Sequence, residues 1–171
     1  MKIYLDTNIL SNMVGGINRL KEDTGIAFQK LAASEHEFIT SPLMKQEMEK
    51  ATSQQVKGAI LFIYKIFGGT KNLNPETYHA TGWGDALWGA VPFGGGETEN
   101  TVLSLLRQAF EVDDAKHIFQ ALSSHSDYFL TLDESTILKR YRRNYMNMKT
   151  FCQNGNLKIV NPEELVKDLG L

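Results

Sequence analysis

The first ten residues, MKIYLDTNIL (residues 1–10), join a short apolar run to an acid. Residues 3–5 are large and apolar or aromatic, which is typical of a buried strand. Asp6 ends this run, and two small polar residues, Thr7 and Asn8, follow it. An Asp in such a place often only starts a turn. The alternative is that a core strand delivers a carboxylate to a functional edge of a sheet.

Short apolar runs alternate with helical patterns along the chain. We expect strands at 2–6, 37–40, 128–132 and 157–160, and helices at 19–33, 42–52, 54–67, 97–110, 113–125 and 162–169. This alternation predicts one α/β domain over residues 1–171, a three-layer sandwich in which helices flank a central, mostly parallel sheet. In such sheets ligands bind outside the carboxyl ends of the strands. Asp6 and Asp133 lie at such ends in the sequence.

Composition restricts the classes of function. Hydrophobic residues make up 42% of the chain and charged residues 22%, as in ordinary globular proteins. The net charge is −2, so binding to nucleic acid would need a local basic patch. One cysteine, Cys152, cannot form an internal disulfide, and we see no secretory signal. The longest apolar segment, 59–67, is too short to span a membrane, so we expect a cytoplasmic protein without membrane contact.

Residues 68–96 form the least regular part of the chain. They are rich in glycine and contain Trp83 and Trp88. We interpret them as an insertion in the domain, either a loop held to the body by two aromatic residues or a lid or partner surface. Residues 88–93 are a candidate edge strand.

A second acid, Glu47, interrupts an apolar helical stripe in SPLMKQEMEKA (residues 41–51). Leu43 and Met44 share its face of the expected helix, whereas Glu49 falls on the other side. Glu47 at the border of the stripe could also reach solvent. Of the two acids, Glu47 is the better site candidate.

A third acid, Asp114, lies at the start of VDDAKHIFQALSSH (residues 112–125). It precedes Ile118 by four residues, a spacing that tilts its side chain toward the sheet. An Asp at a helix start is also stabilised by the free amides and the helix dipole. Asp113 could be that cap and leave Asp114 for a site. His117 could approach Asp114, although a packed structural histidine is the commoner reading.

A fourth acid, Asp133, follows an expected strand in DYFLTLDES (residues 127–135) and repeats the first motif. Thr131 shares its face and could support the site through a hydrogen bond, while Glu134 should point away.

Together the four acids are predicted to meet at one end of one sheet. Two carboxylates ~5 Å apart repel by roughly 3 kcal/mol at an effective dielectric constant of 20. Either some of them are protonated or a divalent cation neutralises them. Oxygen ligands without a cysteine or histidine cage favour Mg²⁺ or Mn²⁺, and such a site suits phosphoryl transfer.

These motifs, LDTNIL, the acid of SPLMKQEME, DDAKHIFQAL, FLTLD and LKIVNPEEL, resemble the PIN domain family of metal-dependent nucleases, which includes VapC-like toxin ribonucleases. The resemblance spans nearly the whole chain. It implies a sheet of about five strands and an endoribonuclease that hydrolyses RNA phosphodiesters with Mg²⁺ or Mn²⁺ and leaves a 5′-phosphate and a 3′-hydroxyl. It also implies an antitoxin partner, if the chain is a toxin, and a homodimer. The glycine-rich insertion departs from the compact toxins.

The resemblance assigns roles residue by residue. The acidic positions of the family fall on Asp6, Glu47, Asp114 and Asp133, as metal ligands and catalytic residues. The small polar supporting positions fall on Thr7, Asn8 and Thr131.

A basic segment, KRYRRNYMNMK (residues 139–149), carries five positive charges and no acid. We interpret it as an RNA-binding rim in which cations contact phosphates and tyrosines stack on bases. The candidate RNA-binding residues are Lys139, Arg140, Tyr141, Arg142 and Arg143. The alternative is a solvated helix face whose tyrosines pack inward.

Two other functions compete with the nuclease. A phosphatase of the haloacid dehalogenase type also begins with a strand that ends in Asp, but it needs a second Asp two residues later, where this chain has Asn8. A catalytically inactive PIN-like module that binds RNA or protein is the stronger rival.

Overall fold

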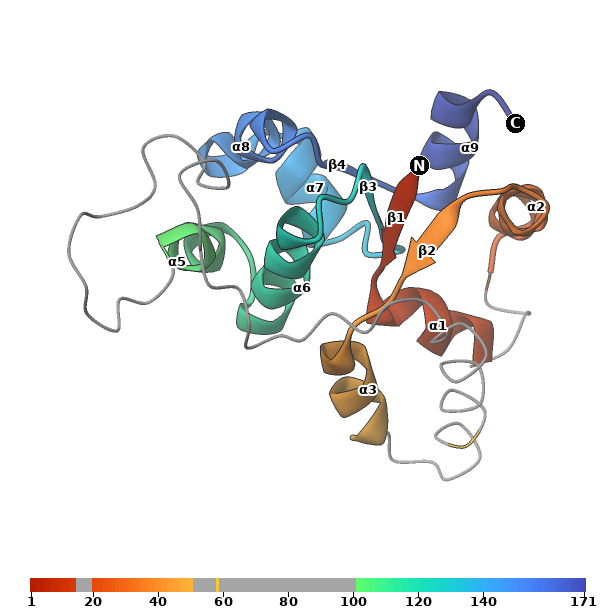
Figure 1. Cartoon of the computed structure of the whole chain (residues 1–171), viewed down its shortest axis with the longest axis horizontal. Helices are drawn as coiled ribbons and strands as arrows, with labels where there is room; N and C mark the ends of the chain where they lie inside the picture. Colours follow the sequence, from red (N-terminus) through yellow and green to blue (C-terminus); the bar gives the residue numbers. More distant parts are fainter. Residues whose placement is uncertain (15–19, 51–57, 59–100) are drawn as a thin grey trace.

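A computed structural model describes residues 1–14, 20–50, 58 and 101–171 of the chain (Figure 1). The described elements, in chain order, are β1 (Lys2–Leu5), α1 (Thr7–Val14), α2 (Glu22–Ala32), β2 (Glu37–Ile39), α3 (Pro42–Glu49), α5 (Thr101–Ala109), α6 (Val112–Ser123), β3 (Tyr128–Leu130), α7 (Ile137–Arg142), the 3₁₀ turn η2 (Tyr145–Asn147), α8 (Met148–Asn154), β4 (Lys158–Val160) and α9 (Pro162–Leu169). The predicted helix at 54–67, the candidate strand at 88–93 and the insertion at 68–96 lie outside the described residues.

The sheet is entirely parallel in the described part of the chain. Its strand order is β2-β1-β3-β4, so β1 lies in the interior of the sheet. In register, Leu5 stands opposite Leu130, and Leu130 stands opposite Val160. The predicted α/β class with a mostly parallel sheet is confirmed, and the described residues supply four of its expected strands.

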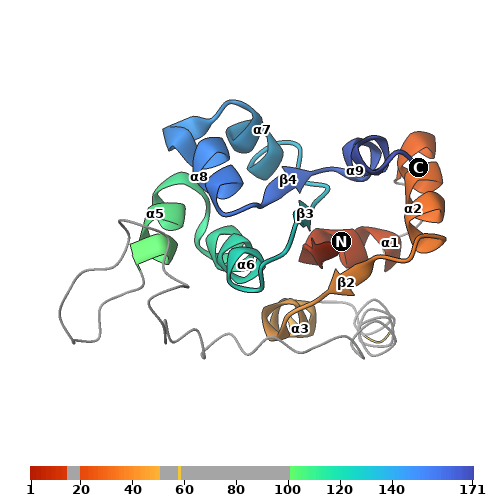
Figure 2. The same cartoon turned by 45° about the horizontal axis from the view of Figure 1, so that its top comes forward.

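Alternate residues of each strand feed two separate cores, as a sheet covered on both faces requires. Tyr4, Phe129 and Ile159 pack against α5, α6, α7 and α8. Ile3 and Leu130 pack on the other face, against α1, α2 and α9. The result is helix, sheet, helix in three layers (Figures 1 and 2).

Three described helices were not predicted: α1, α7 and α8, which are eight, six and seven residues long. By contrast, α9 was predicted with its observed bounds. Its start carries a capping box, in which Asn161 accepts from the amide of Glu164 and Glu164 accepts from the amide of Asn161.

The start of α6 differs from the expectation. The helix begins at Val112, with Glu111 in the cap position, so Asp113 is not the cap. Asp113 is exposed and forms an ion pair of 2.8 Å with Lys116.

Within the described ranges, no helix has the length and apolar character needed to cross a lipid bilayer.

Candidate acidic site

The site lies where β1 and β3 end. The amide of Asp6 donates to the carbonyl of Leu130 over 3.0 Å, and the amide of Thr131 donates to Val160 over 3.1 Å. These bonds continue the ladder one residue beyond the strands. The side-by-side pair at the edge is therefore Asp6 and Thr131, whereas Asp133 lies two residues farther along.

Asp6 is held by its neighbours on both strands. Its Oδ2 atom accepts from the hydroxyl of Thr131 at 2.6 Å and from the side-chain amide of Asn8 at 2.7 Å. The side-chain amide of Asn8 also donates to the hydroxyl of Thr131 at 2.9 Å, and its side-chain oxygen Oδ1 accepts from the backbone amide of Leu132 at 2.9 Å. The supporting positions predicted at Asn8 and Thr131 are thus placed against Asp6, and they fix the orientation of its carboxylate.

Burial of the Asp6 carboxylate disfavours its charged form. Only 6% of Asp6 is exposed, and burial raises the pKa of its carboxyl group. The bond from Thr131 and the proximity of His117 oppose that shift without cancelling it, while nearby Glu47 adds to it. The neutral form of this buried carboxyl group is therefore favoured over its ordinary balance.

The pKa of Asp114 is also raised, by burial and by the charges of neighbouring acids. Asp114 lies in the first turn of α6 and is partly exposed. Burial, followed by the charges of Asp6, Asp133 and Glu111, raises the pKa of Asp114 to about 7. Carboxylates from three separate segments therefore act on one another at this edge of the sheet.

Glu47, from α3, faces His117 of α6. Its Oε1 atom lies 3.0 Å from Nε2 of His117, and Thr7 Oγ1 lies 3.3 Å from the same nitrogen. Burial would raise the pKa of Glu47, but the hydrogen bond and charge of His117, together with a hydrogen bond from Thr7, lower it overall. Glu47 is thus an ionised carboxylate, with only 25% of its side chain exposed.

The other side of the His117 ring enters a buried polar cluster that sequence reasoning missed. Nδ1 of His117 lies 2.8 Å from the hydroxyl of Tyr4. That hydroxyl also lies 2.8 Å from Ser41 Oγ and 2.9 Å from Gln120 Oε1. In the sequence, Tyr4 is indistinguishable from an ordinary apolar strand residue. The only local signal for this cluster is the presence of polar side chains at Ser41 and Gln120, which contact the Tyr4 hydroxyl.

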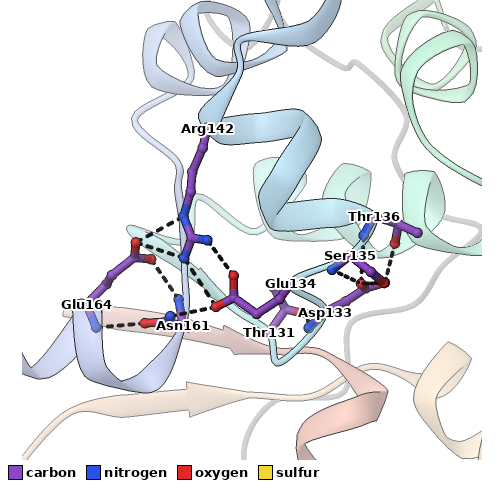
Figure 3. A network of polar contacts seen from close by, with 8 residues as sticks. All are labelled: Thr131, Asp133, Glu134, Ser135, Thr136, Arg142, Asn161 and Glu164. Atoms are coloured by element: carbon purple, nitrogen blue, oxygen red, sulfur yellow. Dashed lines mark hydrogen bonds and ion pairs between the residues drawn. The ribbon is translucent and has the colours of Figure 1, made fainter.

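Asp133 has a different task from Asp6. Its Oδ1 atom accepts from the amides of Ser135 and Thr136 at 3.0 and 2.9 Å and from the hydroxyl of Ser135 at 2.9 Å (Figure 3). Its Oδ2 atom accepts from the hydroxyl of Thr136. Burial alone would raise the pKa of Asp133, but these hydrogen bonds together outweigh burial, so that the pKa is lowered overall. The turn-starting role considered for Asp6 is played by Asp133, just before α7.

Glu134 points away from Asp133 and enters a separate ionic cluster (Figure 3). It pairs with the guanidinium of Arg142 and accepts from the side-chain amide of Asn161 at 2.8 Å. Arg142 also pairs with Glu164 at 2.9 Å. This cluster connects the β3–α7 loop and α7 with the start of α9.

The basic segment is only partly available to a ligand. Tyr141 is 5% exposed and belongs to the core, where burial raises its pKa to about 12, so the prediction that it stacks on bases is corrected. Arg140 donates to the carbonyl of Ala109 at 2.5 Å. Lys139 and Arg143 are exposed. Exposed Tyr145, rather than Tyr141, is the tyrosine of this segment that a base could reach.

The donor set suits Mg²⁺ or Mn²⁺ in chemistry, because it consists of carboxylates under mutual repulsion. In the described ranges, however, no three acidic, histidine or cysteine side chains lie close enough together to form a ready metal site. The carboxylates interact across the edge of the sheet without converging on one point.

Comparisons of the chain with protein-family models, with curated proteins and with solved structures found no match.

Proposed function

We propose that this protein is a Mg²⁺- or Mn²⁺-dependent endoribonuclease of the PIN type. The observation that carries the proposal is the electrostatic conflict at Asp114, whose pKa of about 7 reflects burial and the charges of Asp6 and Asp133. Mutual repulsion of buried carboxylates costs free energy in the metal-free fold, and a bound cation would relieve it, which supports a cation site here. The resemblance of the sequence motifs to PIN nucleases supports the choice of reaction.

In this proposal the acids divide the work. Asp6, Asp114 and Asp133 would hold the ion, which supplies stabilisation of a phosphate oxygen and an activated water when bound. Thr131 and Asn8 keep the Asp6 carboxylate in one orientation through their bonds to its Oδ2 atom. Glu47, kept ionised by His117 and Thr7, orients the attacking water or joins the ligands. Attack of water on phosphorus would break the bond to the 3′-oxygen, which leaves and takes up a proton, so that one fragment ends in a 5′-phosphate and the other in a 3′-hydroxyl.

The replacement Asp6→Asn tests the proposal. An amide keeps the acceptor that Thr131 and Asn8 need, so we expect the same thermal unfolding midpoint or a slightly higher one. It removes the charge, so we expect Mg²⁺-dependent cleavage of RNA to fall at least 100-fold. Gel assays on structured and unstructured RNA, with a chelator control, measure the effect.

Asp168→Asn is the matched control, because Asp168 is an exposed acid of α9 that pairs with Lys158 at 2.9 Å. It should retain full activity. Full activity in Asp6→Asn would refute the assignment.

An inactive PIN-like binding module is the second candidate, and one observation favours it. Both oxygens of Asp133 are engaged by Ser135 and Thr136, and no ready three-ligand metal site exists within the described part of the chain. If the wild-type chain binds RNA in a salt-dependent manner but cleaves none with either metal, this candidate replaces the nuclease.

A toxin role rests on the motif resemblance alone. It predicts growth arrest when the chain is expressed in bacteria, relief of that arrest by Asp6→Asn, and an antitoxin protein that binds near the acids. A homodimer and a cytoplasmic location are proposed on the same basis and on composition.

A further inference from the structure

His117 occupies a position between the core and the candidate site. It is 2% exposed and lies one turn after Asp114 on α6. Its two ring nitrogens contact groups of opposite kinds, an ionised carboxylate on one side and a buried tyrosine hydroxyl on the other. We propose that His117 is a positioning residue that holds the Glu47 carboxylate in the site, with Tyr4 fixing the ring from the sheet. This inference rests on the proposed function and adds a residue to it.

The Nε2 side defines how the histidine holds Glu47. A carboxylate can only accept hydrogen bonds, so Nε2, at 3.0 Å from Oε1, carries a hydrogen. Thr7 contacts both the ring and Glu47. A glutamate side chain has three rotatable bonds and several rotamers. Two donors from two other elements, α6 and α1, select one of them.

The Nδ1 side defines what holds the histidine. The hydroxyl of Tyr4 lies 2.8 Å from Nδ1, and the Tyr4 ring is fully buried and stacks on Phe129 at 5.5 Å between centroids. Ser41 and Gln120 contact the same hydroxyl at 2.8 and 2.9 Å. The ring position is therefore set by β1 of the sheet and by neighbours on other segments. An unbroken chain of contacts connects Tyr4 to His117 and then to Glu47.

A purely structural histidine would not need the exposed end of this chain. The buried partners, Tyr4, Ser41 and Gln120, already lie on the core side of the ring. The other nitrogen, Nε2, contacts the carboxylate of Glu47 on α3, whose side chain is a quarter exposed. Thr7, the residue after Asp6 in sequence, lies near the same nitrogen. Positioning of Glu47 accounts for that choice.

Conservative replacements of His117 separate the two sides of the ring. The amide nitrogen of glutamine can occupy the place of Nε2, and that of asparagine the place of Nδ1. We expect His117→Gln to keep kcat for RNA cleavage within about fivefold of wild type, and His117→Asn and His117→Leu to lower kcat about 100-fold with a small change in KM. Equal losses in the glutamine and asparagine variants would overturn the proposal.

A double-mutant cycle gives the decisive readout. In a Glu47→Gln background, His117→Leu should lower kcat by less than about twofold further, because the carboxylate to be positioned is gone. Multiplying losses would show that His117 acts independently of Glu47 and would overturn the proposal. Ser124→Ala is the matched control, since Ser124 is a buried polar residue at the other end of α6, bonded to Ser126 at 2.7 Å. It should leave kcat unchanged.

Two measurements do not depend on activity. Long-range ¹⁵N–¹H NMR of the wild-type ring should show hydrogen on Nε2, with that preference weakened in Glu47→Gln. The affinity for Mn²⁺, measured by titration calorimetry, should fall about tenfold in His117→Leu. A ring with hydrogen only on Nδ1 contradicts positioning, and unchanged manganese affinity contradicts a place for Glu47 among the metal ligands.

The outcomes keep the two proposals apart. If wild type cleaves RNA and His117→Leu behaves like Ser124→Ala, positioning fails and the nuclease stands. If wild type cleaves nothing, the nuclease fails, and the NMR measurement still decides whether His117 positions Glu47.

Discussion

At the scale of single residues, similar acids acquire different properties from their surroundings. Asp6, buried at the end of β1, has a raised pKa, whereas Asp133, bonded by Ser135 and Thr136, has a lowered one. The pKa of Asp114 is raised to about 7 because burial and the charges of three acids, Asp6, Asp133 and Glu111, act on it together. The sequence motif LDTN and the motif LTLD look alike, but only the first delivers its acid to the strand end itself.

Asp114→Asn should stabilise the metal-free protein in a pH-dependent way. The folded pKa of Asp114 lies above its ordinary value of 3.8, so the folded state binds more protons than the unfolded state between about pH 4 and 7. Its contribution to stability therefore falls as pH rises through that window. Removing the charge should raise the free energy of unfolding by about 1–2 kcal/mol at pH 8, after discounting for solvent screening, and by almost nothing at pH 4.

Urea unfolding at both pH values with EDTA present measures this effect, and Asp113→Asn is the control at the neighbouring exposed position. Saturating Mg²⁺ should reverse the advantage at pH 8, because wild type then gains from binding. Equal changes in the free energy of unfolding at both pH values would contradict the raised pKa of Asp114.

At the scale of elements, the loop from β3 to α7 serves both the site and the helix. The carboxylate of Asp133 receives the donors of Ser135 and Thr136, and its carbonyl accepts from the amide of Leu138 at 3.0 Å. Thr136, in the cap position of α7, makes no side-chain cap bond of its own. The acid therefore organises the first turn of a six-residue helix that would be marginal alone.

Asp133→Ala should cost about 1 kcal/mol of stability, the usual net cost of losing hydrogen bonds of this kind, while Asp133→Asn should cost a few tenths because its side-chain carbonyl oxygen still accepts. Urea unfolding at pH 7 compares the two. Both variants should lose metal-dependent cleavage, so a variant that is stable and inactive separates the charge from the cap. No loss of stability in Asp133→Ala would show that the bonds to Ser135 and Thr136 contribute little.

At the scale of the whole molecule, the cations of the basic segment differ in how far they are already paired with other groups of the protein. Arg142 is committed to Glu134 and Glu164, which joins α7 to α9, and Arg140 is bonded to Ala109 of α5. Lys139 and Arg143 are exposed. The basic segment starts within α7, six residues after Asp133 in sequence, and Figure 3 shows its Arg142 paired with Glu134 and Glu164.

This distribution ranks the cations for RNA binding. Replacing Lys139 and Arg143 together by glutamine should weaken binding and reduce the slope of log K against log salt by about 1.4 for a single strand. Arg142→Gln should change the slope less than half as much, because its guanidinium is already neutralised by two acids. Fluorescence titrations from 50 to 300 mM salt measure the slopes. A larger effect of Arg142 would show that RNA displaces its partners.

The local pattern by itself determined the α/β class, the strands near 2–6, 37–40, 128–132 and 157–160, and the bounds of α9. These features follow from apolar period, turn residues and capping, which act over a few positions. The helical stripes also singled out Glu47 and Asp114 as site candidates, and the structure places both at intermediate burial.

Only the tertiary structure decided how the acids relate to one another. Strand register placed Thr131, rather than Asp133, beside Asp6, and the fold brought Tyr4 to His117 across more than a hundred residues. A pKa depends on burial and on charges that are close in space, so the value near 7 at Asp114 has no counterpart in local sequence. Local patterns determine which segments form strands and helices, whereas only their packing determines which side chains meet.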